Sequence, residues 1–147
     1  MHHIFISYVA EDTDIAQQLA QGLEAAGYQT WHYTRDSLAG PSYLAQTAQA
    51  IEQSRAVVVV ISRQALDSQQ VTAEVVRAFE GGKSFLPVLR DITHEEFQQH
   101  QPAWRQAMGA AVSVSIPPAG VQAVVPRLVA GLKALDLQPA RAVQPGD

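Results

Sequence analysis

The sequence predicts an α/β protein of the flavodoxin-like type, a three-layer sandwich with a five-stranded parallel sheet in the order 2-1-3-4-5 and helices on both faces. The first observation is an uninterrupted apolar run at residues 56–61 (AVVVVI), which is typical of a strand buried on both faces of a parallel sheet. The second is the alternation of five strand-like segments with amphipathic segments along the whole chain. Such an order favours parallel strands joined by right-handed helical crossovers.

Residues 3–8 (HIFISY) are expected to form the first strand. A polar loop follows it, and Asp12 or Thr13 can cap a helix that Gly27 ends. The inner stripe of this helix is predicted to consist of Ile15, Ala16, Leu19, Ala20 and Leu23.

Residues 28–33 (YQTWHY) are aromatic and β-branched, which predicts the second strand. Residues 34–42 (TRDSLAGPS) are expected to form a loop, which is longer than most connections from a strand to a helix. A helix is then expected at about residues 42–53. Its inward-facing residues are predicted to be Leu44, Ala48 and Ile51.

The helix after the third strand carries one acidic residue near its start, Glu74. Asp67 or Ser68 can cap this helix, and Gly81 with Gly82 ends it. Ligands of open parallel sheets bind beyond the carboxyl ends of the strands, so Glu74 is expected near a ligand site. The predicted buried face consists of Val71, Val75, Ala78 and Phe79, with Glu74 at its edge.

A purely structural role for Glu74 is the alternative. The helix dipole favours a negative charge near the start of a helix. Pairing of Glu74 with Gln70 or Arg77 of the same helix would stabilise it by roughly a few tenths of a kcal/mol.

Residues 84–89 (SFLPVL) are expected to form the fourth strand, and Pro87 predicts that this strand lies toward an edge or pairs incompletely. A short helix near residues 103–108 and a fifth strand at 111–116 follow. The last helix is predicted to bury Val121, Val125, Leu128 and Leu132.

We expect one folded domain at residues 1–136. Residues 137–147 (LQPARAVQPGD) have the composition of a linker or disordered tail that leads to a further domain in the parent protein.

Composition excludes several classes of function. The chain has 147 residues, of which 47% are hydrophobic, and a formal net charge of −4, which argues against a general nucleic-acid binder. It contains no cysteine, which excludes disulfides and thiolate metal sites and fits the cytoplasm. No signal peptide and no membrane span are expected, and the five histidines lack the spacing of a metal site. Glycine-rich phosphate loops and G-x-S-x-G are absent from the sequence.

Four motifs together resemble a TIR (Toll/interleukin-1 receptor) domain over roughly residues 3–135, and look more like bacterial TIR modules than animal receptor ones. They are FISY in the first strand, WHYTRDSLAGPSY after the second, IEQSRAVVVVIS before and through the third, and S-x-x-V-x-x-E on the helix that follows.

The resemblance implies an enzyme, an NAD+ nucleosidase that cleaves the nicotinamide–ribose bond to give ADP-ribose or cyclic ADP-ribose, with Glu74 as the catalytic residue. Nicotinamide leaves a cationic pyridinium as a neutral group, so one carboxylate that stabilises the oxocarbenium-like ribose can suffice. NAD+ would be the substrate, with no separate cofactor and no metal. The implied substrate-binding residues are Ser7, Tyr8, Tyr33, Asp36, Gly40, Tyr43 and Gln70.

The resemblance also matches residues 33–43 to the BB loop, which gates the nucleotide pocket and contacts a neighbouring TIR domain. It implies that other TIR domains are partners, in a homo-oligomer or filament that forms on activation, in bacterial antiphage defence. Neither nucleic acid nor membrane is expected as a partner. The implied assembly residues are Arg35, Ser37, Leu38, Gly40 and Pro41.

Two positions depart from the family pattern. Gln70 stands where many members have tryptophan, and Val9 stands where the residue is often basic. The alternatives to an enzyme are a TIR–TIR interaction module without turnover and a receptor for a nucleotide signal.

Overall fold

The computed structural model describes residues 3–109 and 111–139. Its centre is a five-stranded sheet in the order β2-β1-β3-β4-β5, and every neighbouring pair is parallel, as the sequence predicts. The strands are β1 (His3–Ser7), β2 (Gln29–Trp31), β3 (Ser54–Ile61), β4 (Ser84–Leu89) and β5 (Val114–Ser115).

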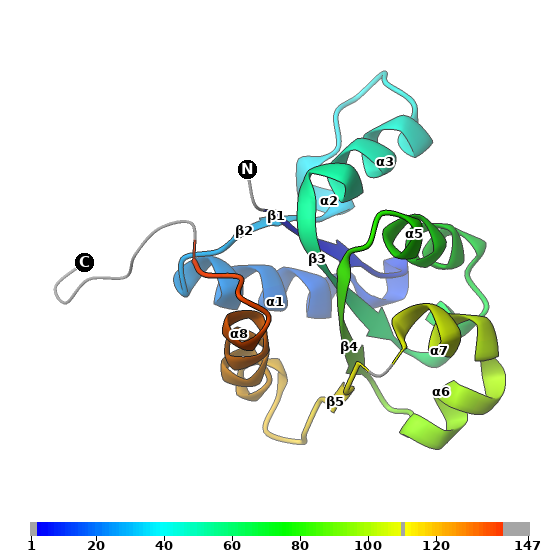
Figure 1. Cartoon of the computed structure of the whole chain (residues 1–147), viewed down its shortest axis with the longest axis vertical. Helices are drawn as coiled ribbons and strands as arrows, with labels where there is room; N and C mark the ends of the chain where they lie inside the picture. Colours follow the sequence, from blue (N-terminus) through cyan, green and yellow to red (C-terminus); the bar gives the residue numbers. More distant parts are fainter. Residues whose placement is uncertain (1–2, 110, 140–147) are drawn as a thin grey trace, which may run out of the picture.

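Helices cover both faces of this sheet (Figure 1). Helices α1 and α8 lie on one face, and α3, α5, α6 and α7 lie on the other. The helices are α1 (Thr13–Ala25), α2 (Tyr33–Asp36), α3 (Tyr43–Gln53), α4 (Arg63–Leu66), α5 (Gln69–Glu80), α6 (His94–His100), α7 (Pro102–Met108) and α8 (Val125–Ala134), with short 3-10 turns η1 (Ala10–Asp12) and η2 (Val121–Ala123).

Strand β3 divides the core into two halves because successive side chains of a strand point to opposite faces. Val58 and Val60 pack with α1 and α8, whereas Val57 and Val59 pack with the helices of the other face. The same alternation along β1 sends Ile6 to the α1 side and Phe5 to the α5 side. Ser7 shares the face of Phe5, and this places its hydroxyl under α5.

The predicted stripes of α1 and of the last helix are confirmed, but two other predicted core residues are exposed. Leu44 is 70% exposed because the inward face of α3 is formed by Thr47, Ala50 and Ile51 instead. Phe79 is also exposed, since it follows Ala78 and lies a further 100° around α5, past its buried face.

The segment predicted as a loop at residues 34–42 is partly helical, because Tyr33–Asp36 form the short helix α2. The side chain of Asp12 does not cap α1 either. It is buried at the carboxyl end of the sheet, where it accepts a hydrogen bond from Ser62 Oγ at 2.5 Å and one from Arg90 Nη1 at 2.8 Å.

The expectation for Pro87 is confirmed. Strand β5 pairs only with Val88 and Leu89, so Pro87 lies where β4 has a single strand neighbour, β3. Helix α6 was not predicted. Its signal is a capping box in which the side chains of Thr93 and Glu96 bond each other's backbone N–H groups.

The described chain continues past the expected domain end at residue 136. Leu137 packs on the α1–α8 half of the core, and its carbonyl accepts a hydrogen bond from the Tyr28 hydroxyl at 2.8 Å. Residues 140–147 of the predicted linker lie outside the described residues. In the described part of the chain, no helix is both long and apolar enough to cross a membrane.

Candidate functional site

Glu74 lies in the second turn of α5, on the buried face of the helix rather than at its edge. Ser68 caps the helix by accepting a hydrogen bond from the Val71 N–H. Glu74 then shares the buried face with Val71, Val75 and Ala78, and only 5% of it is exposed. A carboxylate at a core position needs hydrogen-bond donors to offset its lost hydration.

Those donors come from three different elements. Ser7 Oγ, at the end of β1, donates to Glu74 Oε1 at 2.6 Å, and the Tyr43 hydroxyl, at the start of α3, donates to Oε2 at 2.8 Å. Gln70 Nε2 lies one turn earlier on α5, at 3.5 Å from Oε2. The end of β1 and the helix after β3 therefore face one crevice, as the strand order predicts.

Hydrogen bonds, and no ion pair among the described residues, offset the burial of the Glu74 carboxyl group. Burial raises the pKa of Glu74, and the hydrogen bonds from Ser7, Tyr43 and Gln70 act in the opposite direction. Burial and the nearby Glu74 carboxylate likewise raise the pKa of the Tyr43 hydroxyl. None of the ion pairs formed by the described residues includes Glu74. A ligand that brings positive charge to Glu74 would therefore be favoured.

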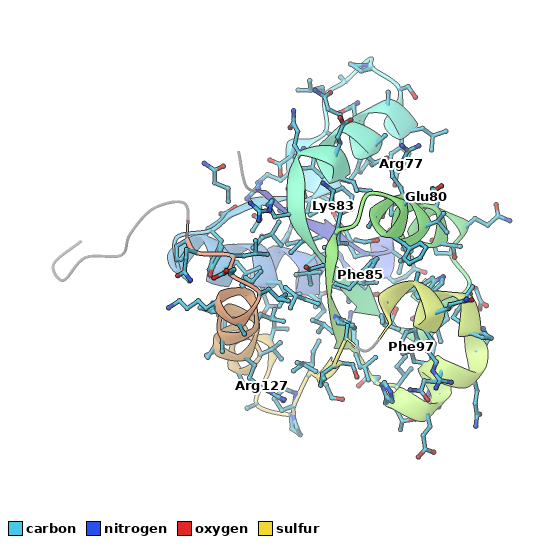
Figure 2. All side chains as sticks on the ribbon, in the orientation of Figure 1. Arg77, Glu80, Lys83, Phe85, Phe97 and Arg127 are labelled. Atoms are coloured by element: carbon cyan, nitrogen blue, oxygen red, sulfur yellow. The ribbon has the colours of Figure 1, made fainter. Side chains whose placement is uncertain are left out.

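A groove between α3 and α5 leads to this carboxylate. Its volume is about 540 Å³, which lies in the usual range for small-molecule sites. The side chains of Arg77 and Glu80 lie along it on α5 (Figure 2). Helix α3 lines it with Tyr43, Leu44, Thr47 and Ile51, and α5 lines it with Gln69, Gln70, Ala73, Glu74, Val76, Arg77 and Glu80.

The structure brings Ser7, Tyr43 and Gln70 to Glu74, but it does not bring Tyr8 there. Tyr8 packs with the α1 half of the core, on the opposite face of the sheet from Ser7. Its hydroxyl accepts a hydrogen bond from the Thr34 N–H at 2.9 Å and thereby holds α2. Tyr33 lies close by, with its ring 4.7 Å from the ring of Tyr43 in an edge-on arrangement.

Arg35 and Asp36 lie on α2 and pair with each other rather than reaching Glu74. Arg35 Nη2 is 2.7 Å from Asp36 Oδ2, and Arg35 Nη1 is 2.5 Å from Glu24 on α1. Asp36 Oδ2 also accepts the His32 N–H at 3.0 Å. These contacts fasten α2 to α1.

The predicted assembly residues Ser37, Leu38, Gly40 and Pro41 form the connection from α2 to α3. Gly40 has φ of 100°, a conformation that favours glycine, and Leu38 is 68% exposed.

Gln46, which was not predicted as a functional residue, holds this connection in place. Its side-chain amide accepts the Leu38 N–H at 2.6 Å and donates to the Leu38 carbonyl at 2.8 Å and to the Pro41 carbonyl at 3.0 Å. No sequence motif marks a glutamine for this role, since the contacts depend on how the chain folds back.

A second polar cluster lies at the carboxyl ends of β3 and β4, around the buried Asp12. Arg90 also approaches Asp14, at 3.4 Å. Because Asp12, Ser62 and Arg90 come from three separate segments, the cluster joins η1 to the loops after two strands. Among the residues with described placement, no group of three or more His, Cys, Asp or Glu side chains could hold a metal ion.

The fold and site define a flavodoxin-like α/β domain with a buried carboxylate where the ends of its central strands meet the following helix. The sequence matches the family model described as TIR domain over residues 4–112, and the chain belongs to that family. No curated protein matches the sequence.

Several solved structures share this fold. One contains the TIR domains of the activated Roq1 resistosome that directly recognises the pathogen effector XopQ; identity is 18%, coverage 90% of this chain and 99% of that one, and TM-score 0.70. The TIR domain of the Toll-related receptor TRR-2 from Hydra magnipapillata has 22% identity, coverage of 87% and 94%, and TM-score 0.65. The CMP N-glycosidase BcmB from Clostridium botulinum has 12% identity, coverage of 86% and 97%, and TM-score 0.59. At these identities the likeness concerns the fold alone.

Proposed function

We propose that this TIR domain is an NAD+ glycohydrolase or cyclase in which Glu74 is the catalytic carboxylate. The observation that carries the proposal is a carboxylate that is 5% exposed, has three side-chain donors, has no cationic partner among the described residues, and borders a groove large enough for a small molecule. Such a carboxylate is suited to binding a cation with hydroxyl groups. The pyridinium riboside of NAD+ has both features.

The reaction breaks the bond between ribose C1′ and the pyridinium nitrogen. The electron pair of this bond stays on nitrogen, so nicotinamide leaves as a neutral molecule and positive charge develops on the ribose. Glu74 stabilises that charge and accepts hydrogen bonds from ribose hydroxyls, in positions that the hydroxyls of Ser7 and Tyr43 occupy in this structure. Attack of water on C1′ gives ADP-ribose and releases one proton, and attack by an adenine nitrogen gives a cyclic product.

The CMP N-glycosidase among the structures of similar fold supports this proposal, because it is an enzyme that acts on an N-glycosidic bond. We further propose that activity is switched on by assembly of TIR domains in the cytoplasm, as part of bacterial antiphage defence. Nicotinamide release from NAD+, measured by chromatography on the parent and on Glu74→Gln, tests the catalytic part.

The pH dependence of turnover gives a further test. Only the ionised carboxylate stabilises a cation, and burial holds the pKa of Glu74 above its ordinary value of 4.5, so kcat/KM should rise with pH through that raised pKa and fall below it. Pyridinium itself has no proton to lose in this range. A profile between about pH 4.5 and 8 that is flat in the parent would contradict the assignment.

A non-catalytic interaction module is the second candidate, and the exposed connection between α2 and α3 favours it. Leu38 projects from that connection, Gly40 fixes its turn, and Gln46 holds its shape. Without turnover, this surface would recruit other TIR domains.

Substituting the connection should separate the two roles. Leu38→Asp replaces an exposed apolar side chain with a charged one. Gly40→Arg puts a residue with a side chain at a position where φ is 100°. We expect either change to weaken self-association by at least about tenfold, the effect of roughly 1.4 kcal/mol, in sedimentation velocity. Glu74→Ala should leave association unchanged. An unaltered sedimentation profile for both loop variants would exclude this surface.

A further inference from the structure

The groove between α3 and α5 leaves two large apolar side chains open to solvent on opposite walls. Leu44 projects from α3, and Val76, 46% exposed, projects from α5. Both line the cavity that Glu74 also lines. Covering apolar surface that borders a cavity is favourable for binding, because it removes that surface from water.

Ala73 lines this groove on α5 and also borders a neighbouring cavity that Thr72 and Gln101 line. Residues three and four apart share a helix face, so Gln70, Ala73 and Arg77 follow one another along the groove. Ala73 is exposed, and its methyl group is the smallest side chain among the described residues that line the groove, so it leaves room for a ligand at this position. Ala73 and Glu74 point about 100° apart around α5, but both line the same cavity, so a ring on Ala73 would share that cavity with the carboxylate.

The charges of the groove indicate which part of a nucleotide it takes. Among the described residues that line it, Arg77 is the one basic residue, and Glu80 lies three residues further along α5. Opposite charges at this spacing offset each other, whereas phosphate groups are held best by bidentate or multiple cationic contacts. The groove therefore suits a planar ring rather than a pyrophosphate.

We propose that the leaving base of the substrate lies flat on Ala73, between Leu44 and Val76, and that Ala73 determines which bases fit. The proposal rests on the proposed function, because it places the leaving group beside Glu74. The ligand class is a planar aromatic base with a neutral or cationic ring, such as the pyridine of NAD+.

Because the chain contains no cysteine, one introduced thiol can report on the groove. We expect NAD+ at about millimolar concentration to slow the reaction of an Ala73→Cys thiol with a maleimide by at least about fivefold, since a bound ring covers this position. Nicotinamide alone should also slow it. Ala103→Cys, at an exposed alanine on α7, is the matched control and should react at the same rate with and without NAD+. Equal rates for the Ala73→Cys thiol in both conditions would overturn the proposal.

A size test complements the labelling. Ala73→Trp places a bulky ring where the base is proposed to lie and should lower kcat/KM for nicotinamide release at least about tenfold, mainly by raising KM. Ala103→Trp should leave kcat/KM unchanged, and both variants should keep the melting temperature of the parent. Full activity in Ala73→Trp counts against the proposal.

Failure of this inference can be told from failure of the proposed function. If Glu74→Gln abolishes nicotinamide release while NAD+ leaves the Ala73→Cys thiol reactive, the reaction is supported and the placement of the base is wrong. If NAD+ protects that thiol while Glu74→Gln retains full turnover, the base site is supported and the catalytic role of Glu74 is wrong.

Discussion

Glu74→Gln is expected to lower nicotinamide release from NAD+ by roughly 10² to 10³-fold or more, the range found when a charge-stabilising group is removed from an active site. Glutamine fills the same space and keeps hydrogen-bonding capacity toward Ser7 and Tyr43, but it supplies no negative charge for the oxocarbenium-like ribose. The assay should use the protein at high concentration, because the proposed activation requires neighbouring TIR domains.

Glu95→Gln is the matched control, since Glu95 is an exposed acidic residue in the first turn of α6 and does not line the groove. Its nicotinamide release should stay within about twofold of the parent. Comparable losses in the two variants would indicate a general effect of charge and not a catalytic carboxylate.

Glu74→Gln should also increase stability. Burial raises the folded-state pKa of Glu74, so the folded protein binds this proton more tightly than the unfolded chain does. The tighter binding of this proton therefore stabilises the fold below the unfolded-state pKa of Glu74. This stabilisation is lost as pH rises through the folded-state pKa of Glu74. Near pH 7 the glutamine variant should be more stable than the parent, on the order of 1 kcal/mol. The gain should vanish at about pH 4, which chemical denaturation at the two pH values would show.

Asp12→Ala is expected to lower the free energy of unfolding by about 2 to 4 kcal/mol. The Asp12 side chain is 2% exposed and receives hydrogen bonds from Ser62 Oγ and Arg90 Nη1. Its removal leaves the Ser62 hydroxyl without that acceptor and the Arg90 guanidinium without its closest carboxylate. Urea unfolding followed by circular dichroism measures the change.

Asp14 provides the control for this experiment because it also approaches Arg90 but is 60% exposed. An exposed ion pair at 3.4 Å contributes little, so Asp14→Ala should change the free energy of unfolding by less than about 1 kcal/mol. If both substitutions cost the same, burial of Asp12 is not what makes the cluster stabilising.

Sequence patterns located the catalytic candidate but misjudged its surroundings. The sequence correctly predicts that Glu74 lies near the start of a helix after a buried strand, but it does not predict that the side chain is buried. A helical wheel places an acidic residue at the edge of an apolar face by default. What buries Glu74 is the approach of two side chains, from residues 7 and 43, that lie 67 and 31 positions away in the chain.

Strand alternation is enough to correct one of the sequence-based predictions. Ser7 and Tyr8 are neighbours in the sequence, and both were assigned to the substrate pocket. Because consecutive side chains of an extended chain point to opposite faces, only one of them can lie under α5. The described contacts identify Ser7 as that residue and place Tyr8 against α2.

By itself, the sequence determined the sheet order and the parallel strands, because these follow from local apolar patterns and from rules of chain connection. The resemblance of its motifs to TIR domains singled out Glu74 as the catalytic candidate. Only the tertiary structure decided which side chains surround Glu74, that Arg35 and Asp36 pair with each other, and that Leu44 borders a groove instead of filling the core. Patterns of local spacing fix the direction in which a side chain leaves its own helix or strand. They do not fix which groups from other segments arrive there, and the chemistry of this site depends on those groups.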